Sequence, residues 1–104
     1  MQRLRMGGAR AMRRAARVDD NQAELVKQLR KAGATVQYLH TQGRGCPDLL
    51  VGWRVLNLLF EVKDPNKPPS ARLLTDDERE WHEKWRGQVH VIETAEEALE
   101  VMGR

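Results

Sequence analysis

Two carboxylates and a lysine stand in the middle of the chain in a pattern that suits metal-assisted chemistry. Asp48 follows Pro47 at the start of one apolar run, and Glu61 and Lys63 flank Val62 near the end of the next. Residues two apart in a strand share a face, so Glu61 and Lys63 point the same way and Val62 the other. In an antiparallel hairpin the start of one strand lies beside the end of its partner, which brings Asp48 to Glu61. Acids and a lysine on one face can hold a divalent cation beside a cationic group, as phosphodiester cleavage requires.

Asp48 and Glu61 are therefore candidate metal ligands, and the main-chain carbonyl near Val62 is a third. Magnesium prefers oxygen ligands and usually takes one or two carboxylates plus waters, so we expect Mg²⁺ or Mn²⁺ and no organic cofactor. Lys63 would orient a water or stabilise charge on the phosphate. The alternative is structural: Glu61 and Lys63 form a solvent-facing pair, and Asp48 caps a turn.

Other kinds of site have less support in the sequence. The histidines and the single cysteine have no paired zinc spacing, and no serine or cysteine stands in a nucleophile motif. Cys46, beside Pro47, is expected to be a small packing residue. The reaction predicted is hydrolysis by water, without a covalent intermediate.

Composition bounds the class of protein. The 104 residues predict one modest core, and no apolar stretch reaches the length of a membrane span. The basic N-terminus lacks the apolar centre of a secretory signal, and a lone cysteine suits a reducing compartment, so we expect a cytoplasmic protein.

Charge divides the chain into an extension, residues 1–17, and a domain, residues 18–104. The extension carries six arginines and no acid, which leaves the domain with a net charge of −3 from a total of +3. Such an arm contacts nucleic acid in some proteins and in others only keeps the chain soluble.

Hydrophobic periodicity and turn residues predict the order α-β-β-β-α-β-α. We expect helices over residues 18–32, 75–85 and 94–102 and strands over 34–40, 47–53, 55–63 and 89–93. Gly33 suits the end of the first helix, and Thr75 with Glu78 forms a capping box, as does Thr94 with Glu97. The continuous apolar run before Glu61 predicts a central strand. The tryptophans are expected in the core or in a dimer interface: Trp53, Trp81 and Trp85.

With these elements in place, the sequence resembles the PD-(D/E)xK nuclease superfamily. The finer resemblance is to its VRR-NUC branch, in the small stand-alone form of phages and bacteria. The residues that carry it run from Asp20 to Met102 and include Asn21–Val26, Gly43–Gly52, Glu61–Lys63, Leu74–Glu78, Trp81–His82 and Trp85–Val89.

The resemblance implies a restriction-endonuclease-like αβββαβ core with a mixed central sheet flanked by helices. It implies Asp48 and Glu61 as metal ligands, Lys63 as the catalytic lysine, and an acid on the first helix. Glu24 matches that acid and Asp20 is the fallback, although Glu24 is equally consistent with a surface residue. Many relatives have Gln where this chain has Glu78, which the capping box also explains.

The function implied is metal-dependent, structure-specific cleavage of DNA, at Holliday junctions and as a homodimer. The alternatives are a flap or nicking endonuclease, a DNA-end exonuclease, or a DNA-binding protein that does not cut. Arg44 between two glycines, and Lys67 and Arg72 in a proline-rich loop, are candidate DNA contacts, and each is alternatively a solvated loop residue.

Overall fold

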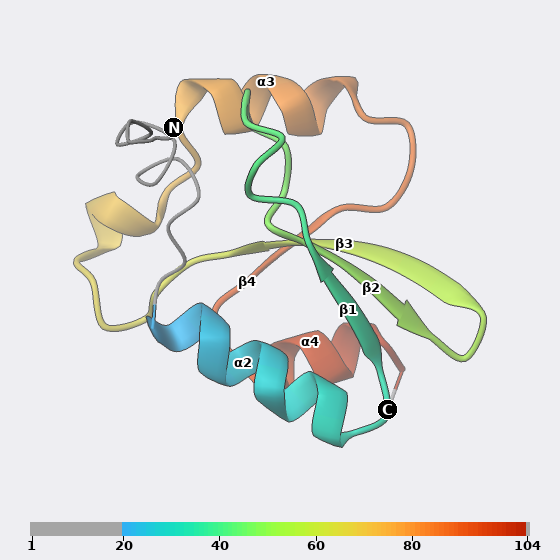
Figure 1. The fold of residues 1–104 in the computed structure, drawn as a ribbon. Helices are drawn as coiled ribbons and strands as arrows, with labels where there is room; N and C mark the ends of the chain where they lie inside the picture. Colours follow the sequence, from blue (N-terminus) through green and yellow to red (C-terminus); the bar gives the residue numbers. More distant parts are fainter. Residues whose placement is uncertain (1–19, 104) are drawn as a thin grey trace, which may run out of the picture.

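The computed structural model describes residues 20–103 (Figure 1). The predicted extension, residues 1–17, lies outside them. The elements, in chain order, are α2 (Asp20–Lys31), β1 (Thr35–Tyr38), β2 (Leu49–Trp53), β3 (Leu56–Val62), the 3₁₀ turn η1 (Pro69–Arg72), α3 (Asp76–Lys84), β4 (His90–Ile92) and α4 (Ala95–Val101). The predicted order of elements is confirmed, with η1 as an addition inside the expected loop.

The strands form one mixed four-stranded sheet in the order β1-β2-β3-β4. β1, β2 and β3 pair antiparallel, and β4 pairs parallel to β3. β3 is central, as its apolar run predicts. Arg54 and Val55 form the turn between β2 and β3 with positive φ angles of 47° and 62°, the backbone hand that matches the twist of a two-residue hairpin. This tight turn fixes the register of the two strands.

The two faces of β3 have different neighbours. Leu58, Phe60 and Val62 are buried in the hydrophobic core. Helices α2 and α4 cover this face of the sheet, and α3 lies on the other side (Figure 1). Full burial of a side chain the size of Phe60 contributes about 1.5–3 kcal/mol, so packing on this face stabilises the fold. Because side chains alternate along a strand, Glu61 projects toward the α3 side.

Local signals set the ends of the helices. Gly33 takes a φ of +108° after α2, a conformation that favours glycine, as predicted for a helix C-terminus. Thr75 and Glu78 form the predicted capping box at α3. At α4 only half of the predicted box forms: Thr94 accepts from the Glu97 amide, but the Glu97 carboxylate accepts from Glu93 instead of Thr94.

Helix α3 differs from the other helices because it buries none of its residues. Trp81 and Trp85 stack with ring centroids 4.6 Å apart, and Trp85 keeps 45% of its surface exposed. The core alternative is therefore wrong for Trp81 and Trp85, because the core side of the sheet is already covered by α2 and α4. The dimer-interface alternative stays a prediction. None of the helices within residues 20–103 is long and apolar enough to cross a membrane.

Candidate active site

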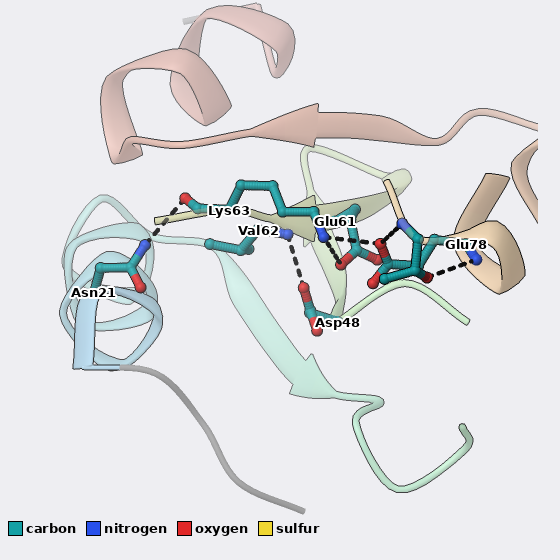
Figure 2. Close-up of polar contacts among 7 residues, drawn as sticks. Asn21, Asp48, Glu61, Val62, Lys63 and Glu78 are labelled. Atoms are coloured by element: carbon teal, nitrogen blue, oxygen red, sulfur yellow. Dashed lines mark hydrogen bonds and ion pairs between the residues drawn. The ribbon is translucent and has the colours of Figure 1, made fainter. Parts of the chain in front are cut away.

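The hairpin register brings the two predicted acids together. Leu49 pairs with Phe60, so the next pair outward along the same register is Asp48 with Glu61. Directly opposed residues share a face of the sheet. The Asp48 carboxylate is held in place by the backbone of β3, because its Oδ2 accepts a hydrogen bond of 2.8 Å from the Val62 amide (Figure 2).

Glu61 is the most unusual acid of this cluster. It is 3% exposed, and its Oε1 has no hydrogen-bond donor among the described residues. Burial, followed by the charges of Asp48 and Glu78 and by the hydrogen bond that a protonated Glu61 donates to one or the other, raises the pKa of Glu61 to about 10. Burial also raises the pKa of Asp48, against the opposing effect of the Val62 amide. In the absence of a cation, Glu61 therefore holds a proton at neutral pH.

Lys63 is fixed at both its side chain and its backbone. Its Nζ donates to Glu78 Oε1 at 2.8 Å and lies 3.7 Å from Glu61 Oε2 (Figure 2). Its amide donates to Ile92 on β4 at 2.9 Å, and its carbonyl accepts from Asn21 Nδ2 of α2 at 3.2 Å. Burial alone would lower the pKa of Lys63, but the hydrogen bond to Glu78 and the neighbouring carboxylates raise it. The lysine is therefore a charged ammonium beside the two acids.

Glu78 reaches this cluster from α3, a contact that the sequence analysis left open because the capping box already explained this residue. Its Oε1 accepts from both Lys63 Nζ and the Thr75 amide, the latter at 2.9 Å. Burial would raise the pKa of Glu78, but these hydrogen bonds lower it. The capping signal shows where α3 begins but not which part of the sheet it meets. Asn21 was missed for a similar reason, since nothing in its sequence context points to Lys63.

The donor set around Asp48 and Glu61 fits a hard divalent cation. The Lys63 amide points toward β4, so the Val62 amide and carbonyl both face the opposite edge, where Asp48 lies. Within residues 20–103 no group of three or more His, Cys, Asp or Glu side chains could enclose a metal ion. The cation that suits two carboxylates and a carbonyl is one that keeps several waters, as Mg²⁺ does. The buried Glu61 Oε1 without a donor is the atom that such a cation would satisfy.

The remaining predicted site residues on α2 and in the loop before Asp48 are exposed to solvent. Glu24 is exposed on α2, where its Oε2 accepts from Gln28 Nε2 at 3.3 Å, and Asp20 is exposed at the start of the same helix. Arg44 is exposed in the loop before Asp48 with a φ of 56°. Within residues 20–103 no hydrogen bond or ion pair joins Glu24 to the cluster, and its role stays a prediction.

The predicted DNA contacts after β3 are divided between two environments. Lys67 is exposed in the loop after β3. Arg72 is half-buried and lies 3.4 Å from Glu93 Oε1, so part of its charge is already paired. Cys46 lies close enough to the acids that burial, followed by the charges of Glu61 and Asp48, raises the pKa of its thiol. A reactive thiolate is thus disfavoured there.

Comparison with known proteins identifies the fold. No family model and no curated protein match the chain. A solved structure described as a VRR_NUC domain matches with a TM-score of 0.57 and 27% identity, over 80% of this chain and 90% of that one. The chain has the fold of a VRR-NUC nuclease domain. The predicted resemblance to VRR-NUC and the predicted fold class are confirmed.

Proposed function

We propose that this VRR-NUC domain is a Mg²⁺- or Mn²⁺-dependent endonuclease that hydrolyses phosphodiester bonds in DNA. The observation that carries the proposal is the convergence of Asp48, Glu61 and Lys63 on the α3 side of the sheet, with Glu61 buried and its Oε1 lacking a donor. A solvent-facing pair would not explain a carboxylate that is 3% exposed beside a second acid. Such burial is costly unless a cation or a proton compensates it.

Each residue of the cluster has a distinct role in this proposal. Asp48, Glu61 and the Val62 carbonyl would hold the cation, which supplies Lewis acidity and lowers the pKa of water when bound. The Val62 amide keeps the Asp48 carboxylate turned toward Glu61. Glu61 must release its proton to act as a ligand, so cation binding and proton release are linked.

Lys63 contributes positive charge where the reaction needs it. Its pKa is raised, chiefly because Glu78 and the neighbouring acids outweigh burial, so the side chain stays an ammonium. An ammonium donates hydrogen bonds and cannot accept a proton, which suits stabilisation of charge on the phosphate oxygens in the transition state. We assign Lys63 this electrostatic role, with water as the nucleophile.

The preferred DNA is proposed to be a four-way junction, cut by a homodimer. One chain offers one such site, and symmetric cleavage of a junction needs two related cuts, which a twofold dimer supplies. The exposed Trp85 and Leu73 near α3 are apolar surface that such a dimer could bury. Arg44, Lys67 and Arg72 are the proposed phosphate contacts, and Glu24 remains the proposed helix acid.

The test is cleavage of synthetic four-way, flapped, nicked and linear DNAs with Mg²⁺, Mn²⁺ or a chelator. We expect metal-dependent cleavage, fastest on the four-way junction. Lys63→Ala should lower the rate by at least about 100-fold, because the charge on the phosphate then loses its partner.

The matched control is Lys27→Ala, which removes an exposed lysine of α2 on the other side of the sheet. It should cut at the wild-type rate. DNA binding without cleavage in any metal would instead support the non-cutting alternative. If flaps or ends are cut faster than junctions, the proposed nuclease activity stands, but the four-way junction is not its preferred substrate.

A further inference from the structure

The position of α3 is not set by burial of its own side chains. None of its residues is buried, and it lies across the sheet from the two helices that share the core (Figure 1). Yet Glu78, in its first turn, reaches Lys63 (Figure 2). Some other contact must hold this turn at a fixed distance from β3.

That contact is made by Gly45, in the loop just before Asp48. Gly45 has a φ of +81°, and a Cβ built there would overlap the Asp77 carbonyl and lie 2.8 Å from the Glu78 amide nitrogen. Real Cβ atoms do not approach backbone that closely, so the first turn of α3 rests directly on the glycine backbone. Gly43, in the same loop, has a similar φ of +69°, but a Cβ there meets nothing within 4 Å.

The capping box then fixes the Glu78 carboxylate, which in turn positions the side chain of Lys63. The Thr75 hydroxyl accepts from the Glu78 amide at 3.2 Å, and Glu78 Oε1 accepts from the Thr75 amide at 2.9 Å. The Glu78 carboxylate is therefore locked within the turn that Gly45 supports. The same oxygen accepts from Lys63 Nζ at 2.8 Å, so the lysine ammonium takes its position from α3 as well as from β3.

We propose that Gly45 and Glu78 are positioning residues for Lys63: Gly45 seats the first turn of α3, and Glu78 uses that turn to hold the ammonium over the two acids. This inference rests on the proposed function, because it assigns to Lys63 a role in cleavage. It makes α3 a part of the active site although α3 contributes nothing to the core.

The first test compares two alanine substitutions in one loop. Gly45→Ala and Gly43→Ala both place a side chain at a positive φ, but only Gly45→Ala displaces α3. We expect Gly45→Ala to lower kcat by about 100-fold with little change in KM, because a shift of about 1 Å in a catalytic group has this effect. Gly43→Ala should keep kcat within about twofold of wild type. Equal kcat values for the two variants would overturn the proposal.

The second test asks whether Glu78 acts by placement. Glu78→Ala should lower kcat about as far as Gly45→Ala, and the double variant should lose no more than either alone, since both remove one positioning contact. Glu78→Gln keeps an oxygen that accepts from Lys63 and Thr75, and should retain most of the activity. The proposal would be contradicted if the double variant lost kcat by the product of the two single losses. It would also be contradicted if Glu78→Gln were as slow as Glu78→Ala.

A readout that needs no cleavage separates this inference from the proposed function. The Lys63 side chain is 12% exposed, so a small acylating reagent should label it slowly, as followed by mass spectrometry. Labelling should accelerate in Gly45→Ala and Glu78→Ala but not in Gly43→Ala. If wild type cuts no DNA yet this pattern holds, the proposed function fails and the placement of Lys63 by α3 stands. Unchanged labelling in all three variants overturns the placement itself.

Discussion

The two faces of β3 have different roles: one packs into the core that stabilises the fold, and the other carries the candidate active site. Phe60 and Val62 enter an apolar core under α2 and α4, whereas Glu61 and Lys63, alternating with them, enter a charged cluster under α3. The core face gains free energy from burial, while the α3 face carries buried carboxylates whose burial opposes folding. Apolar burial on one face of β3 therefore compensates for the unfavourable burial of carboxylates on the other face.

The largest expected effect is on the core face. Phe60→Ala should lower the free energy of unfolding by about 3–5 kcal/mol, because it leaves a cavity where a side chain is 0% exposed. Urea denaturation measures this loss. Leu56→Ala, in the same strand but 44% exposed, should lower it by about 1 kcal/mol or less. Similar losses for the two variants would deny that the core face dominates stability.

The next largest effect is expected on the α3 face, where a substitution should lower the rate of cleavage without lowering stability. Asp48→Asn removes a charge that a cation needs, while the amide oxygen still accepts from Val62. Cleavage should fall by at least about 100-fold, with no loss of stability. Single-turnover kinetics and a thermal melt together check both parts. Asp76→Asn, at a side chain that is 93% exposed, is the control that should change neither. A strongly destabilised Asp48→Asn protein would contradict the division between the faces.

A pH-dependent effect follows from the Glu61 carboxyl. Burial, Asp48 and Glu78 raise its pKa from 4.5 to about 10, so the folded protein binds a proton that the unfolded chain releases above pH 4.5. In chelator, stability should therefore fall between about pH 5 and 10, by up to about 1.4 kcal/mol per pH unit. Glu61→Gln should lose this slope and melt at a higher temperature than wild type at pH 8.

Added Mg²⁺ gives the same experiment a second arm. A cation replaces the proton, so it should stabilise wild type more at pH 8 than at pH 6 and should not stabilise Glu61→Gln. Glu100→Gln, on the exposed part of α4, should keep the wild-type slope and response. A flat pH profile for metal-free wild type would mean that Glu61 is ionised in the fold.

The smallest expected change in stability comes from removing the N-cap of α3 or of α4. Thr94→Ala removes the cap of α4, which packs in the core, and should cost about 1 kcal/mol of stability with cleavage unchanged. Thr75→Ala removes the cap of α3, which buries no residue and can fray locally. It should lower the rate of cleavage with a smaller shift in the urea midpoint. Identical behaviour of the two variants would show that α3 and α4 serve the same purpose.

The parts of the fold that depend on neighbouring residues were predictable. A tight turn between two apolar runs fixes a hairpin, and that register alone places Asp48 opposite Glu61. The alternation of one strand then brings Lys63 to the same face. Capping boxes and Gly33 marked the helix ends for the same local reason.

The parts that depend on how distant elements meet were not predictable. Glu78 and Lys63 are brought together by a long loop and by the Gly45 backbone, neither of which has a periodic signal. Trp81 and Trp85 have the spacing of a buried face, but they stack on each other in a helix that buries none of its residues, because the apolar core lies on the opposite face of the sheet. The DNA that the proposed nuclease prefers depends on surfaces and partners that hydrophobic patterns do not encode.

The alternation along β3 also bears on how the chain avoids misfolding. A slip of one residue against β2 would turn every side chain of the strand to the opposite face. Glu61 and Lys63 would then enter the space that Phe60 and Val62 fill, and a charge moved into apolar surroundings is severely unfavourable. The polar pair thus penalises the wrong alignment of the sheet, so replacing Glu61 or Lys63 by an apolar residue should make mispaired, aggregation-prone forms easier to reach.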